Sequence, residues 1–246
     1  MPAVRHAVVL AGGLGTRLRP YTTSLPKPLV PIGGELPIVE IVLRQLAARG
    51  FQRATLAIGH LGSLIQAVVG DGSRFGLEVD YAVEEQPLGT IGPILQILDR
   101  LPEHFLVLNG DVLTDLDFGA VLAAHEGSGA SLTITTFERV FETELGVLEL
   151  DGDMVVGFRE KPTLRFAVSM GVNGLSATTL SGYEPGTALG FDQLVLDLLG
   201  RGDLPRSFLH DGYWVDIGRP EEYERANAEF AELRSVLLPA GVPGNG

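Results

Sequence analysis

A short apolar stretch that runs into a glycine-rich turn does most to constrain the fold. Residues 8–32 read VVLAGGLGTRLRPYTTSLPKPLVPI, so a buried strand ends in three glycines and the chain then reaches Lys27 between two prolines. Glycine adopts positive φ and lacks Cβ, which lets backbone N–H groups approach an anion closely. The prolines restrict the backbone on both sides of Lys27. Together with Arg17, this stretch predicts a phosphate-binding turn at the end of a strand.

Two common phosphate-binding motifs do not fit this turn. A P-loop needs Gly-Lys followed by Ser or Thr, whereas the only nearby lysine, Lys27, follows a proline. A dinucleotide fingerprint would place a third glycine at position 18, where the chain has Leu18, and the ribose-binding acid expected after the second strand is missing. Glycines alone are also typical of tight strand-to-helix turns, so the prediction depends on the two cations.

Strand and helix patterns alternate along most of the chain. Buried strands are expected at residues 6–11, 54–60, 77–84 and 105–111, and helices at 37–49, 62–69 and 90–100. Further along we expect a helix from about 117, strands at 131–138 and around Asp151-Gly152, a turn at FREKP and a last helix at about 220–236. Alternation at this spacing implies right-handed crossovers and parallel pairing. We predict a Rossmann-like three-layer α/β/α fold with a mainly parallel mixed sheet, formed by one domain over residues 1–236 and followed by a flexible tail over 237–246.

Composition narrows the classes of function. The 246 residues are 45% hydrophobic, enough for one well-packed α/β domain. A net charge of −13 argues against a nucleic-acid partner, because such proteins bind through a basic face. We expect a cytoplasmic protein without membrane contact, because no apolar run approaches the roughly 18 residues of a span, no signal-peptide pattern opens the chain and cysteine is absent. An acidic protein that binds polyphosphate commonly screens it with a divalent cation, so acidic residues near the turn become candidate ligands.

Polar residues follow three of the expected parallel strands, where the ligands of open sheets bind. They are Gly12–Arg17 after the first strand, Glu84–Thr90 after the third and Asn109–Asp111 after the fourth. Guanine presents two adjacent donors that one carboxylate accepts together, whereas uracil and thymine present one N–H between two carbonyls. Glu84 or Glu85 therefore favours guanine as the base.

Other ionisable residues are expected to be structural. Asp115 and Asp117 are expected to cap the following helix, and Asp111 alone is equally compatible with a turn or cap. The five histidines include no closely spaced pair and are interpreted as structural or exposed: His6, His60, His104, His125 and His210.

Six motifs in order resemble the sugar-1-phosphate nucleotidyltransferases. They are LAGGLGTRLRP, PKPLVPI, EEQPLGTIGPI, LNGDVLTDLDF, FREKP and YWVDIGRPEEY, and they span residues from about 6 to 230. Within that family the chain is most similar to the guanylyltransferases of mannose 1-phosphate and heptose 1-phosphate, in a short form without a C-terminal β-helix. The resemblance implies transfer of a nucleotidyl group from a nucleoside triphosphate to a sugar 1-phosphate, with release of pyrophosphate.

The resemblance also implies roles for individual residues. The expected catalytic residues are Arg17 on the β- and γ-phosphates, Lys27 near the α-phosphorus, Lys161 on the sugar phosphate, and Asp111 with Asp216 as the ligands of Mg²⁺. The nucleotide is expected to contact Leu10, Ala11, Gly12, Gly13, Gly15, Thr16, Glu84, Glu85, Pro87, Gly89, Thr90, Asn109 and Gly110. The sugar phosphate is expected to contact Glu160, Lys161, Ser169, Gly146 and Asn173.

One motif departs from the family pattern and leaves the sugar open. Ser169 stands where the family commonly has an asparagine that contacts the sugar, and Asn173 stands where it has a tyrosine. Heptose, mannose and cyclitol 1-phosphates all stay possible, as do UTP, dTTP or CTP as donors. The rival classes are a non-catalytic nucleotide-sugar sensor on the same fold and a nicotinamide-dependent oxidoreductase. The second class does not fit, because this chain lacks the third glycine and the ribose-binding acid of a dinucleotide site. The oligomeric state is open, with a homodimer among the alternatives.

Overall fold

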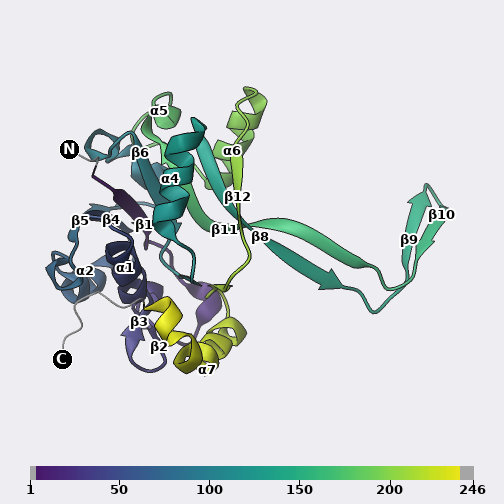
Figure 1. The fold of residues 1–246 in the computed structure, drawn as a ribbon, viewed down its shortest axis with the longest axis horizontal. Helices are drawn as coiled ribbons and strands as arrows, with labels where there is room; N and C mark the ends of the chain where they lie inside the picture. Colours follow the sequence, from purple (N-terminus) through teal and green to yellow (C-terminus); the bar gives the residue numbers. More distant parts are fainter. Residues whose placement is uncertain (1–3, 239–246) are drawn as a thin grey trace.

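A seven-stranded sheet forms the centre of the computed structural model, which describes residues 4–238 (Figure 1). The strand order is β12-β8-β11-β6-β1-β4-β5. The strands are β1 His6–Leu10, β4 Arg53–Ile58, β5 Glu78–Val83, β6 His104–Asn109, β8 Leu132–Glu142, β11 Thr163–Ser176 and β12 Arg206–His210. Every neighbouring pair is parallel except the two that involve β11, so the expected mainly parallel mixed sheet is confirmed.

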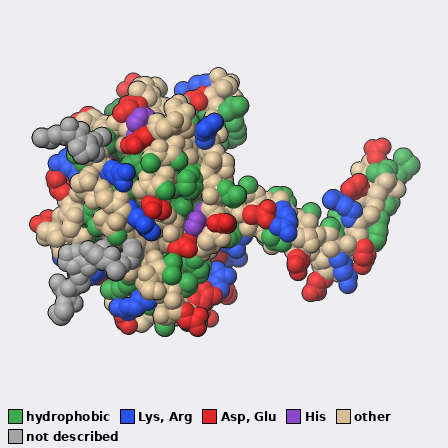
Figure 2. All heavy atoms as spheres, viewed as in Figure 1, with side chains coloured by type: hydrophobic (Ala, Val, Ile, Leu, Met, Phe, Trp, Pro, Cys, Tyr) green, Lys and Arg blue, Asp and Glu red, His purple; other side chains and the backbone are tan. Residues whose placement is uncertain are grey.

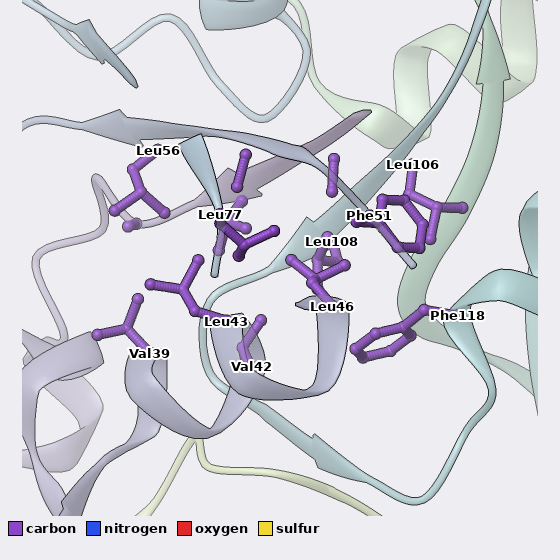
Figure 3. Packing of buried hydrophobic residues seen from close by; sticks show 14 of the residues in the cluster. Val39, Val42, Leu43, Leu46, Phe51, Leu56, Leu77, Leu106, Leu108 and Phe118 are labelled. Carbon is purple, nitrogen blue, oxygen red and sulfur yellow. The ribbon is translucent and has the colours of Figure 1, made fainter. Parts of the chain in front are cut away.

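Helices cover both faces of the sheet, because the central strands are apolar on both sides. Along β1, Ala7 and Val9 face one buried cluster and Val8 faces the other. The first cluster packs under α1 Ile38–Ala48, α2 Gly62–Val69 and α4 Phe118–Ser128, and the second under α3 Gly92–Leu95, α5 Ala177–Leu180 and α6 Phe191–Gly200. Figure 3 shows Val39, Val42, Leu43 and Leu46 of α1 against strand residues such as Leu56 and Leu108. Such continuous apolar strands are typical of sheets buried on both faces.

A third cluster joins short strands to the last helix. The pairs are β2 Pro31–Ile32 with β3 Leu36–Pro37, and β7 Val112–Thr114 with β13 Trp214–Asp216. The last helix, α7, spans Pro220–Leu237 and buries Phe230 against them. Because Asp216 pairs with Val112, the antiparallel β7–β13 pair brings the end of β6 next to a segment more than a hundred residues away.

A long arm projects from this body (Figure 1). The outer parts of β8 and β11 pair as far as Glu142 and Thr163, and the small hairpin of β9 Val147–Asp151 and β10 Met154–Arg159 continues them. We define the arm as residues 138–168. Among the residues the structure describes, β9 and β10 pair only with each other.

The predicted elements agree with these bounds to within a few residues for most of the chain. The helix predicted at 90–100 is instead the short α3 followed by a 3₁₀ turn at Leu98–Arg100, and the long β11 as well as α6, β7 and β12 had not been predicted. The tail predicted from 237 begins with Leu237, which is the last residue of α7 and is buried, and from 239 onward it lies outside the described residues. Within the described residues, no helix is both long and apolar enough to cross a membrane.

Candidate active site

A cleft of about 560 Å³ opens where β1, β4, β5 and β6 end. Its volume lies within the usual range for a site that takes a small ligand. The predicted residues that line it are Leu10, Ala11, Gly12, Gly13, Lys27, Glu84, Glu85, Pro87, Gly89, Thr90, Asn109, Gly110 and Asp111. The structure therefore brings together most of the residues predicted for the nucleotide, from the ends of β1, β5 and β6 and from the segment that carries Lys27.

The glycine-rich turn passes close to Glu84 at one end of the cleft. A Cβ added at Gly12 would lie 2.5 Å from Glu84 Oε2, and one added at Gly13 would have no atom within 4 Å. Glycine at position 12 thus lets the carboxylate approach the backbone of the turn. Gly15, at φ 61°, starts the 3₁₀ helix Thr16–Leu18, which carries Arg17 away from the turn.

Glu84 is held in place by the loop that follows it. Its Oε1 accepts a hydrogen bond of 3.2 Å from the Leu88 backbone N–H. Burial raises the pKa of Glu84, and the Leu88 hydrogen bond lowers it in part. At Gly89 the chain turns with φ 81° against Leu189, 2.6 Å from where a Cβ would lie, and Thr90 accepts a 2.6 Å hydrogen bond from the Phe191 N–H. The loop is therefore anchored to the start of α6.

Lys27 meets two carboxylates at the other end of the cleft. Its Nζ forms an ion pair with Asp111 Oδ2 and lies 3.9 Å from Asp216 Oδ1. Lys27 begins the 3₁₀ helix Lys27–Leu29 between Pro26 and the buried Pro28, a turn that the sequence did not predict. The Ile217 N–H donates to the Asp111 carbonyl at 3.1 Å and fixes the two aspartate segments side by side.

The carboxyl group of Asp216 responds to its surroundings. Burial, followed by the negative charge of Asp111, raises the pKa of Asp216, and the charge of Lys27 offsets part of this rise. Asp111 Oδ1 is buried and has no hydrogen-bond partner. Among residues 4–238, no group of three or more His, Cys, Asp or Glu side chains could hold a metal ion. A cation here would have two protein carboxylates and would need its other ligands from a substrate.

Arg17 lies beside the aspartate pair, on the exposed side. A Cβ added at Gly218 would be 3.8 Å from Arg17 Nη2 and 3.7 Å from Asp216 Oδ2, so the two side chains flank this glycine. The guanidinium is exposed and also lowers the pKa of Asp216. Glu222 lies there too, because its Oε2 accepts a 2.9 Å hydrogen bond from the Gly218 N–H, so two cations and three carboxylates gather at this end of the site.

Neighbouring polar residues support the site without lining it. Asp117 accepts a 3.0 Å hydrogen bond from the Ala120 N–H at the start of α4, so it caps the helix as predicted. The same expectation for Asp115 is wrong, because its Oδ1 instead contacts His210 and accepts from the Tyr213 N–H, both at 2.8 Å. Asp115 thus holds the segment that leads into β13.

The residues predicted for the sugar lie elsewhere in this structure. Gly146, Glu160 and Lys161 are on the exposed arm, where a Cβ added at Gly146 would lie 3.4 Å from Glu160 Oε2. Ser169 and Asn173 lie at the root of the arm, where the β8–β11 register shifts. None of these five residues lines the cleft, and their roles stay predictions. The exposed Thr16 and the half-buried Gly15 are likewise outside its lining.

Sequence reasoning missed one face of the cleft. His60 and Gly59 follow β4 and line the cleft together with Leu14, Pro28 and Ala57. The sequence groups His60 with the structural or exposed histidines, and the structure shows it exposed on the lining of the cleft. Its position directly after a parallel strand next to β1 was the signal that could have identified it.

Comparisons with known proteins identify the family. A mannose-1-phosphate guanylyltransferase of Mycobacterium tuberculosis is 34% identical over 91% of this chain and 64% of its own length, and a mannose-1-phosphate guanyltransferase of Schizosaccharomyces pombe is 32% identical over 95% and 68%. The chain thus spans roughly two thirds of the length of these relatives. The crystal structure of HddC from Yersinia pseudotuberculosis, 29% identical, matches 92% of this chain and all of that chain with a TM-score of 0.72, and a related structure of HddC holds GMP-PN. Residues 6–232 match the nucleotidyl transferase family, and the chain belongs to that family.

Proposed function

We propose that this protein transfers a guanylyl group from GTP to a sugar 1-phosphate and releases pyrophosphate. The observation that carries the proposal is the arrangement of the cleft, with the oriented Glu84 carboxylate at one end and Lys27 with Asp111 and Asp216 at the other. The names of the curated relatives and the GMP-PN complex of HddC support guanine as the base. Both proposed substrates are cytoplasmic metabolites, so the proposal places the protein there.

Glu84 would read the base. Its Oε2 faces the turn at Gly12, and its Oε1 is already engaged by the Leu88 N–H, so the carboxylate is oriented before any ligand arrives. A carboxylate that accepts from both N1–H and the 2-amino group of guanine meets only one donor on uracil or thymine. The proposed preference for GTP therefore rests on one oriented side chain.

The reaction needs alignment and charge neutralisation more than acid–base chemistry. The acceptor phosphate is already an anion, so it attacks the α-phosphorus in line while the bond to the leaving pyrophosphate breaks. Lys27 would stabilise charge on the α-phosphate, and Arg17 would bind the β- and γ-phosphates that leave. Restricting the backbone around Lys27 with two prolines would keep its ammonium where that charge develops.

Asp111 and Asp216 would hold Mg²⁺. The buried Asp111 Oδ1 without a hydrogen-bond partner and the nearby Asp216 carboxylate offer the hard oxygen ligands that this ion prefers. When bound with substrate, the ion would neutralise phosphate charge and complete its coordination with phosphate oxygens. The Lys27 ammonium keeps the two carboxylates from facing each other unscreened in its absence.

Residues of the arm and its root would hold the acceptor. Lys161 would bind the sugar phosphate and Glu160 two sugar hydroxyls, with Gly146, Ser169 and Asn173 beside the ring. The Asn173 Oδ1 is buried without a hydrogen-bond partner, which fits a group that waits for a ligand hydroxyl. Ser169 in place of asparagine shortens the reach at one position, so the sugar is the least constrained part of the proposal.

The experiment is to measure pyrophosphate release for the four NTPs against a panel of sugar 1-phosphates that includes mannose, heptose and glucose. We expect release with GTP and one acceptor, and loss of release when EDTA removes divalent cations. Release with UTP, dTTP or CTP in preference to GTP would overturn only the proposed preference for guanine and leave the reaction class intact. No release with any pair, together with tight binding of a nucleotide sugar, would favour the non-catalytic sensor.

A further inference from the structure

The arm carries an apolar surface that the body does not cover. In the β9–β10 hairpin, Leu150 pairs with Val155 and Leu148 pairs with Phe158, which places these four side chains on one face. Leu150 is 62% exposed and Phe158 is 61% exposed. Figure 2 shows hydrophobic side chains along the outer end of the arm. The opposite face carries the charged Glu149, Asp151 and Arg159 together with Met154 and Val147, so charge is confined to one face and the face of the four apolar side chains is open to solvent.

This concentration of exposed apolar residues is specific to the arm. Ten of the twenty-one large hydrophobic side chains exposed among residues 4–238 belong to the 31 residues of the arm. A two-stranded ribbon is marginally stable by itself, and apolar patches of this kind mark interaction surfaces. The hairpin therefore needs a partner surface. The arm has seven acidic residues against four basic ones, which disfavours an anionic lipid surface as that partner.

The root of the arm is packed so that the arm points away from its own cleft. Phe137 lies 5.4 Å from Trp214 between ring centroids, and the Arg139 guanidinium lies 4.9 Å over the same indole ring. Trp214 also donates a 3.2 Å hydrogen bond from Nε1 to the Met170 carbonyl of β11. These contacts fix both strands of the arm to β13, and Figure 1 shows the outer end of the arm far from the strand ends that form the cleft.

Lys161 is the second unusual feature of the arm. Only two of the eighteen basic residues of the chain are lysines, and both precede a proline: Lys27-Pro28 and Lys161-Pro162. Lys27 lies in the cleft. Lys161 has φ 41°, a left-handed backbone conformation that is uncommon for a residue other than glycine. Within the described residues its ammonium makes no ion pair or hydrogen bond.

Among residues 4–238, the cations at the cleft are already assigned, since Arg17 beside the aspartate pair is proposed to bind the β- and γ-phosphates of GTP. All lining residues of the cleft come from positions 10 to 111, and its only lysine is paired with Asp111 and close to Asp216. The exposed Leu14 at its rim offers an apolar contact. Each chain thus presents a cleft that needs a cation and an arm that needs a surface, and carries the missing lysine where its own cleft cannot receive it.

We infer that two copies of this chain exchange arms. In this dimer the apolar face of each β9–β10 hairpin packs on the body of the partner, and Lys161 with Glu160 enters the mouth of the partner's cleft to bind the acceptor. A two-fold exchange covers the apolar face of both arms and supplies a lysine to both clefts. It gives a closed dimer, because each copy gives one arm and receives one. The assignment of Lys161 to the acceptor phosphate rests on the proposed function, whereas the dimer does not.

The dimer is tested first by light scattering of the purified chain after size-exclusion chromatography, a measurement that needs no activity. We expect a dimer for the wild type, and monomers when Leu148→Glu and Phe158→Glu are combined to place charges on the apolar face. Leu204→Glu is the matched control, because Leu204 is a leucine of the body that is 70% exposed, and we expect this variant to stay dimeric. A wild-type monomer, or a dimer that survives the double substitution, overturns the exchange.

The composite site is tested by complementation. Asp111→Asn and Lys161→Ala are co-expressed with different affinity tags, and the heterodimer is purified through both tags. One of its two sites then combines an intact cleft with an intact arm, so we expect about half of the wild-type rate of pyrophosphate release, while each variant alone is nearly inactive. No recovery in the heterodimer means that Lys161 acts within its own chain or not at all, and overturns the composite site. If the wild type releases no pyrophosphate, the proposed function fails while the size measurement still decides the dimer.

Discussion

The cleft and the arm hold their residues in opposite ways. In the cleft, Lys27, Glu84 and Asp111 come from segments that begin or end in buried strands and turns, and neighbouring backbone groups orient them. In the arm, Glu160 and Lys161 stand on a two-stranded ribbon whose large side chains face solvent. The donor half of the site is thus preorganised by the fold. The acceptor half depends on what the arm packs against.

The largest expected effect comes from the aspartates of the cleft. Asp111→Asn keeps the shape of the side chain but removes the charge that pairs with Lys27. We expect kcat to fall by about 10²–10³-fold, the usual loss when one group that acts on developing charge is removed. Pyrophosphate release under saturating substrates measures this. Asp117→Asn is the matched control, since asparagine also caps helices and Asp117 lies outside the cleft. A wild-type rate for Asp111→Asn would contradict the site.

A smaller effect is expected at the base-reading end. Glu84→Gln replaces one of two acceptor oxygens with a donor, so one donor of guanine would lose its partner. We expect kcat/KM for GTP to fall about 10- to 100-fold, the range for a hydrogen bond to a charged group, while kcat/KM for UTP changes little. The exposed neighbour Glu85→Gln serves as the control. An equal loss with GTP and UTP would mean that Glu84 supports the loop and does not read the base.

The same residue gives a pH dependence. Because burial raises the pKa of Glu84, its carboxylate takes up a proton at a pH where an ordinary glutamate is still ionised. Recognition of GTP should therefore be complete above that raised pKa and be lost as the pH falls through it. The measurement is the ratio of kcat/KM for GTP between wild type and Glu84→Gln at each pH. In this ratio the contribution of Asp216, whose pKa is also raised, cancels. A ratio that does not change with pH would contradict this role.

The glycine turn offers a still smaller and closely matched test. Gly12→Ala would place Cβ 2.5 Å from Glu84 Oε2, so the flexible end of Glu84 must move and its orientation toward the base is lost. We expect KM for GTP to rise about tenfold with little loss of stability, since a displaced hydrogen bond costs on the order of 1 kcal/mol. Gly13→Ala introduces the same methyl group where no atom lies within 4 Å, and should behave as wild type. Equal effects of the two substitutions would exclude a role for the Gly12–Glu84 approach.

The contrast between cleft and arm also explains what the sequence could predict. Apolar runs such as the one around Val8 and Val9 predict buried parallel strands. Ligands bind at the carboxyl ends of such strands, so the position of the cleft could be predicted as well. The position of the arm had no such signal. Its direction is set by Phe137, Arg139 and Met170 against Trp214, contacts between segments dozens of residues apart. β7 has only three residues, too few for any periodicity to register, although it places Asp216 beside Asp111.

The smallest expected effect is the change in GTP binding when the arm is removed, and this measurement separates the two halves of the site. Residues 143–162 can be replaced by a two-residue Asn-Gly turn, since Glu142 and Thr163 are already paired across β8 and β11. The body keeps its own core, so the shortened chain should bind GTP with a Kd within about twofold of the wild-type value. A tenfold change in Kd would require a change of about 1.4 kcal/mol in the binding free energy. Isothermal titration with GTP measures this, and transfer to the acceptor should be lost in the same variant. Lost GTP binding in a folded, shortened chain would mean that the arm orders the donor half as well, and that cleft and arm are one site rather than two independently built halves.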